Sequence, residues 1–136
     1  MALPHATPAV ITGDFAFISG MLGAINGKVV EGGTIAELRQ AFDNLEALFR
    51  KLESHGFKGL GSIVAATIYL ADMHDYPEVN DAYMQRLPHL PISLEESPST
   101  TGRPSRTCVQ VVVPREGKFE ITVVAYRGRT PVLYIA

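Results

Sequence analysis

Two charged residues stand within apolar segments near the end of the chain, where a charge is costly unless it has a partner or a function. Arg106 follows Pro104 at the start of one such segment, and a guanidinium there needs an anionic partner such as a carboxylate. Glu120 lies between Phe119 and Ile121, where a carboxylate is either paired or a carrier of protons. The simpler interpretation of both Arg106 and Glu120 is a charged side chain that faces solvent.

Strand alternation predicts a polar cluster around Arg106. It places Arg106, Cys108 and Gln110 on one face of a strand and the intervening residues on the other. We interpret Cys108 as a small, buried residue and not as a nucleophile, because no histidine stands near it in the sequence. Since it is the single cysteine, the chain can form neither an internal disulfide nor a multi-cysteine zinc site.

The histidines and the glycine pairs do not match known metal or phosphate motifs. The four histidines are His5, His55, His74 and His89. They show neither the i, i+4 spacing of a helical metal site nor a nearby carboxylate pattern. Gly59-Leu60-Gly61 lacks the frame of a phosphate loop, and Ser19 before Gly20 lacks the Gly-x-Ser-x-Gly frame of a nucleophile elbow. We therefore expect no metal and no bound cofactor.

The elements that must position these residues begin with a hairpin and a long amphipathic helix. Residues 15–18 form an apolar run typical of a buried strand, and Asn26-Gly27 predicts a turn through which the chain returns along residues 28–30. Thr34 is the expected N-cap of the helix, with Glu37 completing a capping box. Apolar residues then recur at three- and four-residue spacing until Gly56 ends the helix.

The second half of the chain predicts a strand, a helix and a terminal hairpin. Residues 62–71 are almost wholly apolar, as in a strand covered on both faces, and residues 78–87 form a second helix that ends near Pro88. The proline-rich stretch 88–104 is expected to be a long surface loop. Strands at 107–113 and 118–126 should pair through a turn at 114–117. The order is ββαβαββ, which predicts an α+β fold with two helices on one face of a single mixed sheet.

Length and composition support one domain across residues 1–136 and narrow the range of partners. A hydrophobic fraction of 46% in 136 residues is enough for a real core. The net charge of -2 does not favour binding to nucleic acid or to an anionic membrane. No apolar run approaches the roughly 20 residues that a bilayer span requires. We expect a cytoplasmic protein, with a mitochondrial location as the open alternative.

Four segments in the same order resemble those of the RidA/YjgF/UK114 family. The C-terminal signature is Pro104 to Val111, followed by Pro114 and by Phe119-Glu120-Ile121. The other blocks are Phe17 to Gly20, Arg39 to Leu45 and Thr67 to Tyr83. The resemblance covers about residues 13–127. It implies a chorismate-mutase-like α+β fold and a homotrimer with clefts between neighbouring subunits.

The resemblance also implies an activity and a set of site residues. Family members that keep the arginine hydrolyse reactive 2-imino and enamino acids, such as 2-iminopropanoate and 2-iminobutanoate, to 2-oxo acids and ammonia. Arg106 would bind the substrate carboxylate, Glu120 would position or deprotonate water, and Cys108 would contribute mainly backbone groups. The residues expected to line or support the cleft are Ser19, Gly20, Asn80 and Tyr83.

Three features depart from the family pattern and leave other functions open. No tyrosine precedes Phe15, the stretch 88–104 is longer than in common members, and the stretch from Arg106 to Pro114 is one residue short. A simple terminal hairpin would also direct Glu120 away from the Arg106 face unless a bulge intervenes. The alternatives are a larger, aminomuconate-like enamine substrate, or a non-catalytic trimer that binds a small carboxylate or acts like a chaperone. The apolar tail, residues 131–136, suggests a surface that needs cover by another subunit, and it could equally fold onto its own subunit.

Overall fold

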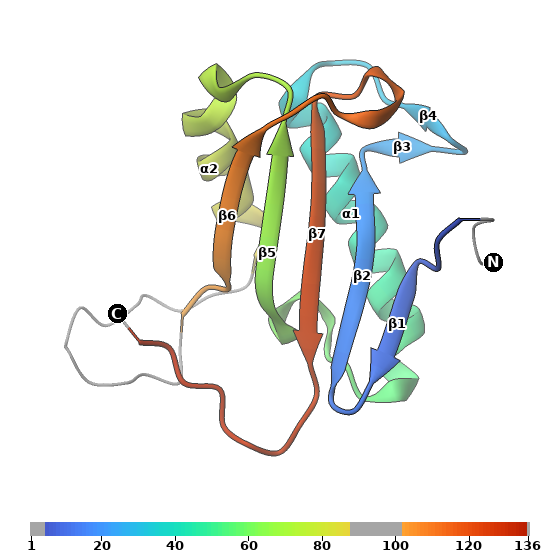
Figure 1. Ribbon diagram of the computed structural model, residues 1–136, viewed down its shortest axis with the longest axis vertical. Coiled ribbons are helices and arrows are strands. Elements are labelled where there is room, and N and C mark those ends of the chain that lie inside the picture. Colours follow the sequence, from blue (N-terminus) through green and yellow to red (C-terminus); the bar gives the residue numbers. More distant parts are fainter. Residues whose placement is uncertain (1–4, 88–101, 136) are drawn as a thin grey trace.

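The computed structural model describes residues 5–87 and 102–135 and shows a five-stranded mixed sheet with two helices on one face (Figure 1). The elements are β1 (Ala9–Thr12), β2 (Phe15–Leu22), β3 (Ala24–Ile25), β4 (Lys28–Val29), α1 (Thr34–Leu52), β5 (Ile63–Leu70), α2 (Tyr76–Arg86), β6 (Ser105–Gln110) and β7 (Phe119–Tyr126). Of the described residues, none belongs to a helix that could cross a bilayer.

The last two strands do not form the predicted hairpin. The sheet order is β1-β2-β7-β5-β6, so β7 lies between β2 and β5 and is antiparallel to both. Strand β6 instead joins the outer edge of β5 in parallel. The chain passes from β6 to β7 through a short 3₁₀ turn at Pro114–Glu116, in which Arg115 and Glu116 have φ angles of 58° and 57°. The prediction was wrong because β5 separates two strands that are adjacent in sequence.

The N-terminal hairpin differs from the predicted one in its pairing. Strand β1, which was not predicted, pairs with β2 through a turn at Gly13, whose φ of 55° suits a glycine. The Asn26-Gly27 turn is confirmed, with φ angles of 52° and 79°. However, it joins β3 to β4 in a small separate sheet and does not return the chain along β2.

The start of α1 is fixed by contacts with distant segments and not by the predicted capping box. Gly33 is the N-cap, and no side chain caps it. Thr34 Oγ1 donates to Asp75 Oδ2 at 2.6 Å, while Glu37 Oε1 accepts from the Lys118 amide at 2.7 Å. The predicted end is confirmed, since Gly56 closes the helical segment with φ of 93°.

The core lies between α1 and one face of the sheet. The predicted apolar stripe of α1 is buried, including Leu38, Phe42 and Leu45, each fully inaccessible to solvent. On β5 the buried residues alternate with partly exposed ones from Ala66 to Leu70, and Ile68 and Leu70 are among those buried. The prediction that this strand is covered on both faces is therefore wrong for a single chain, because α1 and α2 cover only one of them. Helix α2 begins two residues earlier than predicted.

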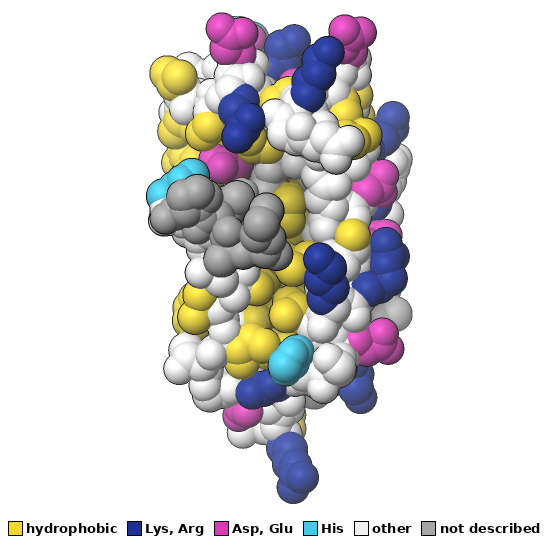
Figure 2. Space-filling view, turned by 90° about the vertical axis from the view of Figure 1, so that its right-hand side faces the viewer, with side chains coloured by type: hydrophobic (Ala, Val, Ile, Leu, Met, Phe, Trp, Pro, Cys, Tyr) yellow, Lys and Arg dark blue, Asp and Glu magenta, His cyan; other side chains and the backbone are white. Residues whose placement is uncertain are grey.

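The sheet face opposite the helices, which we call the open face, carries exposed apolar side chains. Val10, Phe15, Phe17 and Val109 lie on it and are 51%, 42%, 47% and 36% exposed. The edge at β1 is also apolar, since Ala9 and Ile11 are only partly buried against the core. Figure 2 shows an apolar strip along that side of the molecule, bordered by lysine and arginine side chains.

Most of the predicted loop, 88–101, lies outside the described residues, as does Ala136. The tail before Ala136 folds back on its own chain. A Cβ placed on Gly102 would lie 2.7 Å from the Tyr134 ring, so the ring packs directly on the backbone there. Leu133 and Ile135 nevertheless remain 57% and 69% exposed.

Candidate functional site

Arg106 is held by one face of α2. Its Nη2 donates to Asn80 Oδ1 at 2.6 Å and to the Tyr76 hydroxyl at 3.2 Å. Its guanidinium carbon lies 4.8 Å from the centroid of the Tyr83 ring and 5.6 Å from that of Tyr76. These three helix residues are spaced i, i+4 and i+7, which aligns them on one face of a helix. The arginine of the outer strand is therefore fixed by hydrogen bonds and by cation–π contacts.

The polar cluster predicted on the Arg106 face is confirmed in part. Arg106 and Gln110 both contact the segment that contains α2, because Gln110 Oε1 accepts from the Met73 amide at 2.7 Å. That segment is also tied to α1 through the bond between Thr34 and Asp75. The segment that leads into α2 is thus tied both to β6 and to α1.

Tyr83 presents its ring to Arg106 while its hydroxyl is buried. Its side chain is only 3% exposed, and the hydroxyl has no hydrogen-bond partner among the described residues. Burial raises the pKa of Tyr83 above 10, and the positive charges of Arg106 and Arg103 oppose that rise. The Tyr83 phenol is therefore neutral at neutral pH. It contacts the Arg106 guanidinium through its ring and provides no phenolate to pair with that charge.

Cys108 offers its backbone and not its thiol. Burial raises the pKa of the thiol above 9.0, against a smaller opposing effect of Arg106, so the thiolate is scarce at neutral pH. In a parallel pair, alternate residues direct both backbone groups toward the neighbouring strand. The Val111 amide donates to the Leu70 carbonyl at 2.9 Å, so the Cys108 amide and carbonyl face the outer edge of the sheet.

Glu120 lies beside Ser19 and Gly20. Strand β2 has a bulge between Ile18 and Met21, and a Cβ on Gly20 would collide with Glu120 Oε1. Burial raises the pKa of Glu120 above 4.5. Ser19 Oγ donates to the Thr7 carbonyl at 2.6 Å, which holds the N-terminal segment against the bulge.

The two predicted catalytic residues do not share a face of the sheet. Arg106 is in register with Ala66, which pairs with Val123, whereas Glu120 pairs with Tyr69. Val123 and Glu120 are three residues apart on one strand and so point in opposite directions. The structure thus groups Arg106, Asn80, Tyr83 and Cys108 near α2, and Ser19, Gly20 and Glu120 on the open face. One chain does not bring these two groups together.

Within residues 5–87 and 102–135, no three His, Cys, Asp or Glu side chains are grouped closely enough to bind a metal ion. His74 Nδ1 lies 2.8 Å from Asp72 Oδ1 at the surface, and His89 lies outside the described residues.

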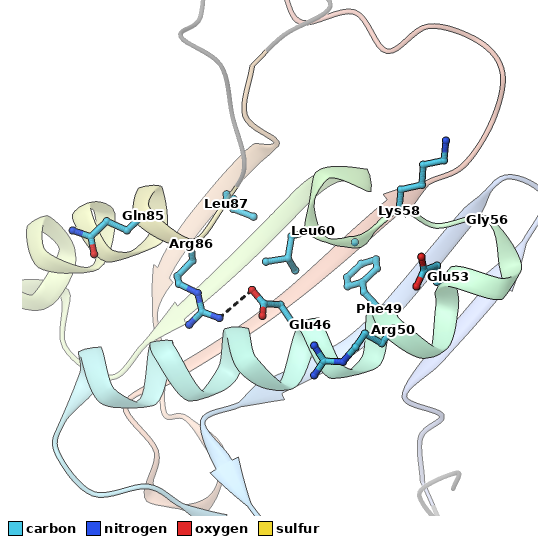
Figure 3. Close-up of a pocket in the computed structure, with 11 residues that line it drawn as sticks. Glu46, Phe49, Arg50, Glu53, Gly56, Lys58, Leu60, Gln85, Arg86 and Leu87 are labelled. Carbon is cyan, nitrogen blue, oxygen red and sulfur yellow. Dashed lines mark hydrogen bonds and ion pairs between the residues drawn. The ribbon is translucent and has the colours of Figure 1, made fainter.

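A hollow of about 860 Å³ lies between α1 and the end of α2 and was not predicted (Figure 3). Phe49, Leu60 and Leu87 give it an apolar lining, and Arg86 Nη2 pairs with Glu46 Oε1 at 3.2 Å at its border. It contains none of the predicted site residues.

Tyr76 is the residue near Arg106 that sequence reasoning missed. The i, i+4, i+7 spacing of Tyr76, Asn80 and Tyr83 is the signal that could have indicated it.

Comparisons with known proteins agree with this fold. A family model described as Endoribonuclease L-PSP matches residues 2–127. A 2-iminobutanoate/2-iminopropanoate deaminase from Capra hircus is 32% identical over 130 residues, which cover 93% of this chain and 83% of the relative. A protein with the same name from Escherichia coli K12 is 31% identical over 118 residues, covering 85% of this chain and 81% of the relative.

A solved structure of a RidA protein has the same fold as this chain. RidA from an Antarctic Psychrobacter superposes with a TM-score of 0.71 at 27% sequence identity, covering 93% of this chain and 91% of the other. The family match spans nearly the whole chain, and its relatives include proteins named as imine deaminases. The chain therefore belongs to the RidA/YjgF family, whose model carries the description Endoribonuclease L-PSP.

Proposed function

We propose that this protein hydrolyses small 2-imino and enamino acids, such as 2-iminopropanoate and 2-iminobutanoate, to 2-oxo acids and ammonia. The observation that carries the proposal is the arginine held by α2, with Arg106 Nη2 2.6 Å from Asn80 Oδ1 and its guanidinium against the Tyr83 ring. A fixed guanidinium suits a planar carboxylate, the group common to these substrates. The names of the Capra hircus and Escherichia coli relatives point to the same chemistry.

In this mechanism Arg106 orients the substrate and Glu120 handles protons. The carboxylate of the imino acid binds Arg106, and the amide of Cys108 at the sheet edge is available to orient substrate or water. Glu120 takes a proton from water as the water oxygen bonds to the iminium carbon. Glu120 returns that proton to the nitrogen of the carbinolamine, and the C–N bond breaks as the oxygen forms the C=O bond. Glu120 takes the hydroxyl proton in the same step and later releases it to solvent, while 2-oxo acid and ammonia leave. The raised pKa of Glu120 fits a group that both accepts and returns a proton.

The proposed assembly is a homotrimer with its sites at subunit interfaces. Arg106 and Glu120 lie on opposite faces of one sheet, so a shared site needs Arg106 from one subunit and Glu120 from the next. The open face carries exposed aromatic side chains, including Phe15 and Phe17, which favours its burial against another subunit. Ser19 and Gly20, next to Glu120, would then line the same cleft.

The test is a competition between this protein and semicarbazide for an imine that is generated in situ. An amino-acid oxidase acting on alanine produces 2-iminopropanoate, and semicarbazide traps the imine that is not hydrolysed. The protein should divert imine to pyruvate and reduce the semicarbazone, while Arg106→Ala should not. If the wild-type protein diverts no imine of any size in a substrate panel, the proposal fails. Diversion of larger, aminomuconate-like imines alone would favour the alternative substrate class.

A further inference from the structure

The Tyr76 hydroxyl and Asn80 together occupy one nitrogen of Arg106. Nη2 carries two hydrogens, and it donates to the Tyr76 hydroxyl at 3.2 Å and to Asn80 Oδ1 at 2.6 Å. A guanidinium has two edges with a pair of parallel donors, Nη1 with Nη2 and Nε with Nη2. Because Nη2 belongs to both edges, each edge has one of its two donors engaged by α2.

Because Nη2 is engaged, an incoming carboxylate meets a different pair of donors, a remaining N–H of Arg106 and the hydroxyl of Tyr76. The phenol oxygen of Tyr76 accepts from Nη2, so its own O–H remains able to donate. Tyr76 is 38% exposed, whereas Asn80 is half-buried, so solvent and ligand can reach the phenol more readily. Its position is fixed, because it is the first residue of α2 and follows Asp75, which accepts from Thr34.

We infer that Tyr76 is a substrate-binding residue whose hydroxyl donates to the substrate carboxylate beside a guanidinium N–H of Arg106. The carboxylate is thus bound by one phenol and one guanidinium, and not by two nitrogens of the guanidinium. This inference rests on the proposed function, in which Arg106 binds that carboxylate. It differs from a role in which Tyr76 only occupies Nη2 until the substrate displaces it.

The two roles predict opposite effects of Tyr76→Phe, which keeps the ring against Arg106 and removes only the hydroxyl. If Tyr76 donates to the carboxylate, the variant should bind pyruvate roughly tenfold more weakly, as expected for the loss of a hydrogen bond to a charged group. KM for the imine should rise by a similar factor with a much smaller change in kcat, because ground state and transition state share this contact. If Tyr76 is merely displaced, the variant should bind pyruvate as well as the wild type or better.

The experiment is calorimetric titration of pyruvate into the wild type, Tyr76→Phe, Arg106→Ala and a control, Tyr126→Phe. Tyr126→Phe keeps the ring in place and removes only a hydroxyl that bonds the Thr130 backbone of the same chain, so pyruvate binding should be unchanged. Weaker binding by Tyr76→Phe, with wild-type binding that depends on Arg106, supports the inference. Unchanged or tighter binding by Tyr76→Phe overturns it and leaves the proposed function standing. If the wild type shows no pyruvate binding that depends on Arg106, the inference on Tyr76 and the proposed function both fail.

Discussion

Arg106 and Glu120 point to opposite faces of the sheet, and β5 lies between the two strands that carry them. The register leaves no ambiguity, since Arg106 aligns with Ala66 and Val123 while Glu120 aligns with Tyr69. A site that uses both residues must therefore combine two chains. This relationship connects the proposed chemistry to the proposed trimer, because neither is complete without the other.

Replacing Asn80 by aspartate should block the arginine without disturbing α2. The side chains are nearly isosteric, and a carboxylate at the 2.6 Å position would pair with Arg106 and compete with the substrate carboxylate. We expect kcat/KM for imine hydrolysis to fall by about tenfold or more, with KM rising. Asn80→Ala should have a smaller effect, because it loosens Arg106 but leaves its charge free. Equal activity of Asn80→Asp and the wild type would contradict this role for Asn80.

Two glycine substitutions should separate a catalytic effect from a structural one. At Gly20 an added Cβ meets the carboxylate end of Glu120, a flexible side chain that can move aside. Gly20→Ala should therefore fold normally but displace Glu120 and lower kcat by about tenfold or more. At Gly23 an added Cβ meets the backbone of Glu37, which cannot yield, so Gly23→Ala should lower the Tm strongly. Thermal melts and kinetics of both variants test the pair, and a Gly20→Ala enzyme with full kcat would be inconsistent with this arrangement.

The raised pKa of Glu120 should be visible in both activity and stability. As a base, Glu120 must be deprotonated, so kcat/KM should rise with pH at a midpoint above the ordinary value of 4.5. Glu120→Gln should abolish activity across the profile. Between 4.5 and the raised pKa the folded state holds more protons than the unfolded state, so the free energy of unfolding decreases as pH rises.

The glutamine variant lacks that dependence on pH, which provides the control. The difference in Tm, Glu120→Gln minus wild type, should be lowest at about pH 4. It should increase as pH rises from 4.5 to the raised pKa of Glu120. An acid limb at or below 4.5, or a Tm difference with the opposite slope, would show that burial does not control this carboxyl group.

A charge on the open face should prevent association. Phe17 is 47% exposed there, so Phe17→Asp should convert the proposed trimer to monomers and remove activity. Met84, on α2, has a similar exposure of 38% but does not lie on the open face, so Met84→Asp should remain trimeric. Sedimentation velocity measures both. A wild-type protein that sediments as a monomer would remove the proposed interface site.

Local patterns allowed good predictions where the structure depends on neighbours in the sequence. The stripe of α1, the end at Gly56 and the Asn26-Gly27 turn all follow from short-range periodicity or backbone preference. The capping box failed because Thr34 and Glu37 bind Asp75 and the Lys118 amide, partners that a local pattern does not contain. The strand order failed for the same reason, since β7 inserts between two strands that are distant in sequence.

The candidate site was foreseen through resemblance more than through pattern. Alternation correctly placed Arg106 and Gln110 on one face, and the family blocks supplied Asn80 and Tyr83, which do contact Arg106. Tyr76 was missed because its contact with Arg106 appears only when α2 packs beside β6. Opposite faces for Arg106 and Glu120 were expected from a terminal hairpin, but the structure produces them through the register across β5, which a single sequence does not reveal.

Complementation between two inactive variants tests whether one site combines Arg106 and Glu120 from different subunits. Arg106→Ala and Glu120→Gln chains would be co-expressed with different affinity tags, and assemblies that carry both tags would be isolated and assayed. A site that takes Arg106 from one subunit and Glu120 from the next regains both residues at one interface of the three in every mixed trimer. We expect imine hydrolysis by the mixed assemblies and none by either variant alone. Mixed assemblies as inactive as the separate variants would contradict this expectation.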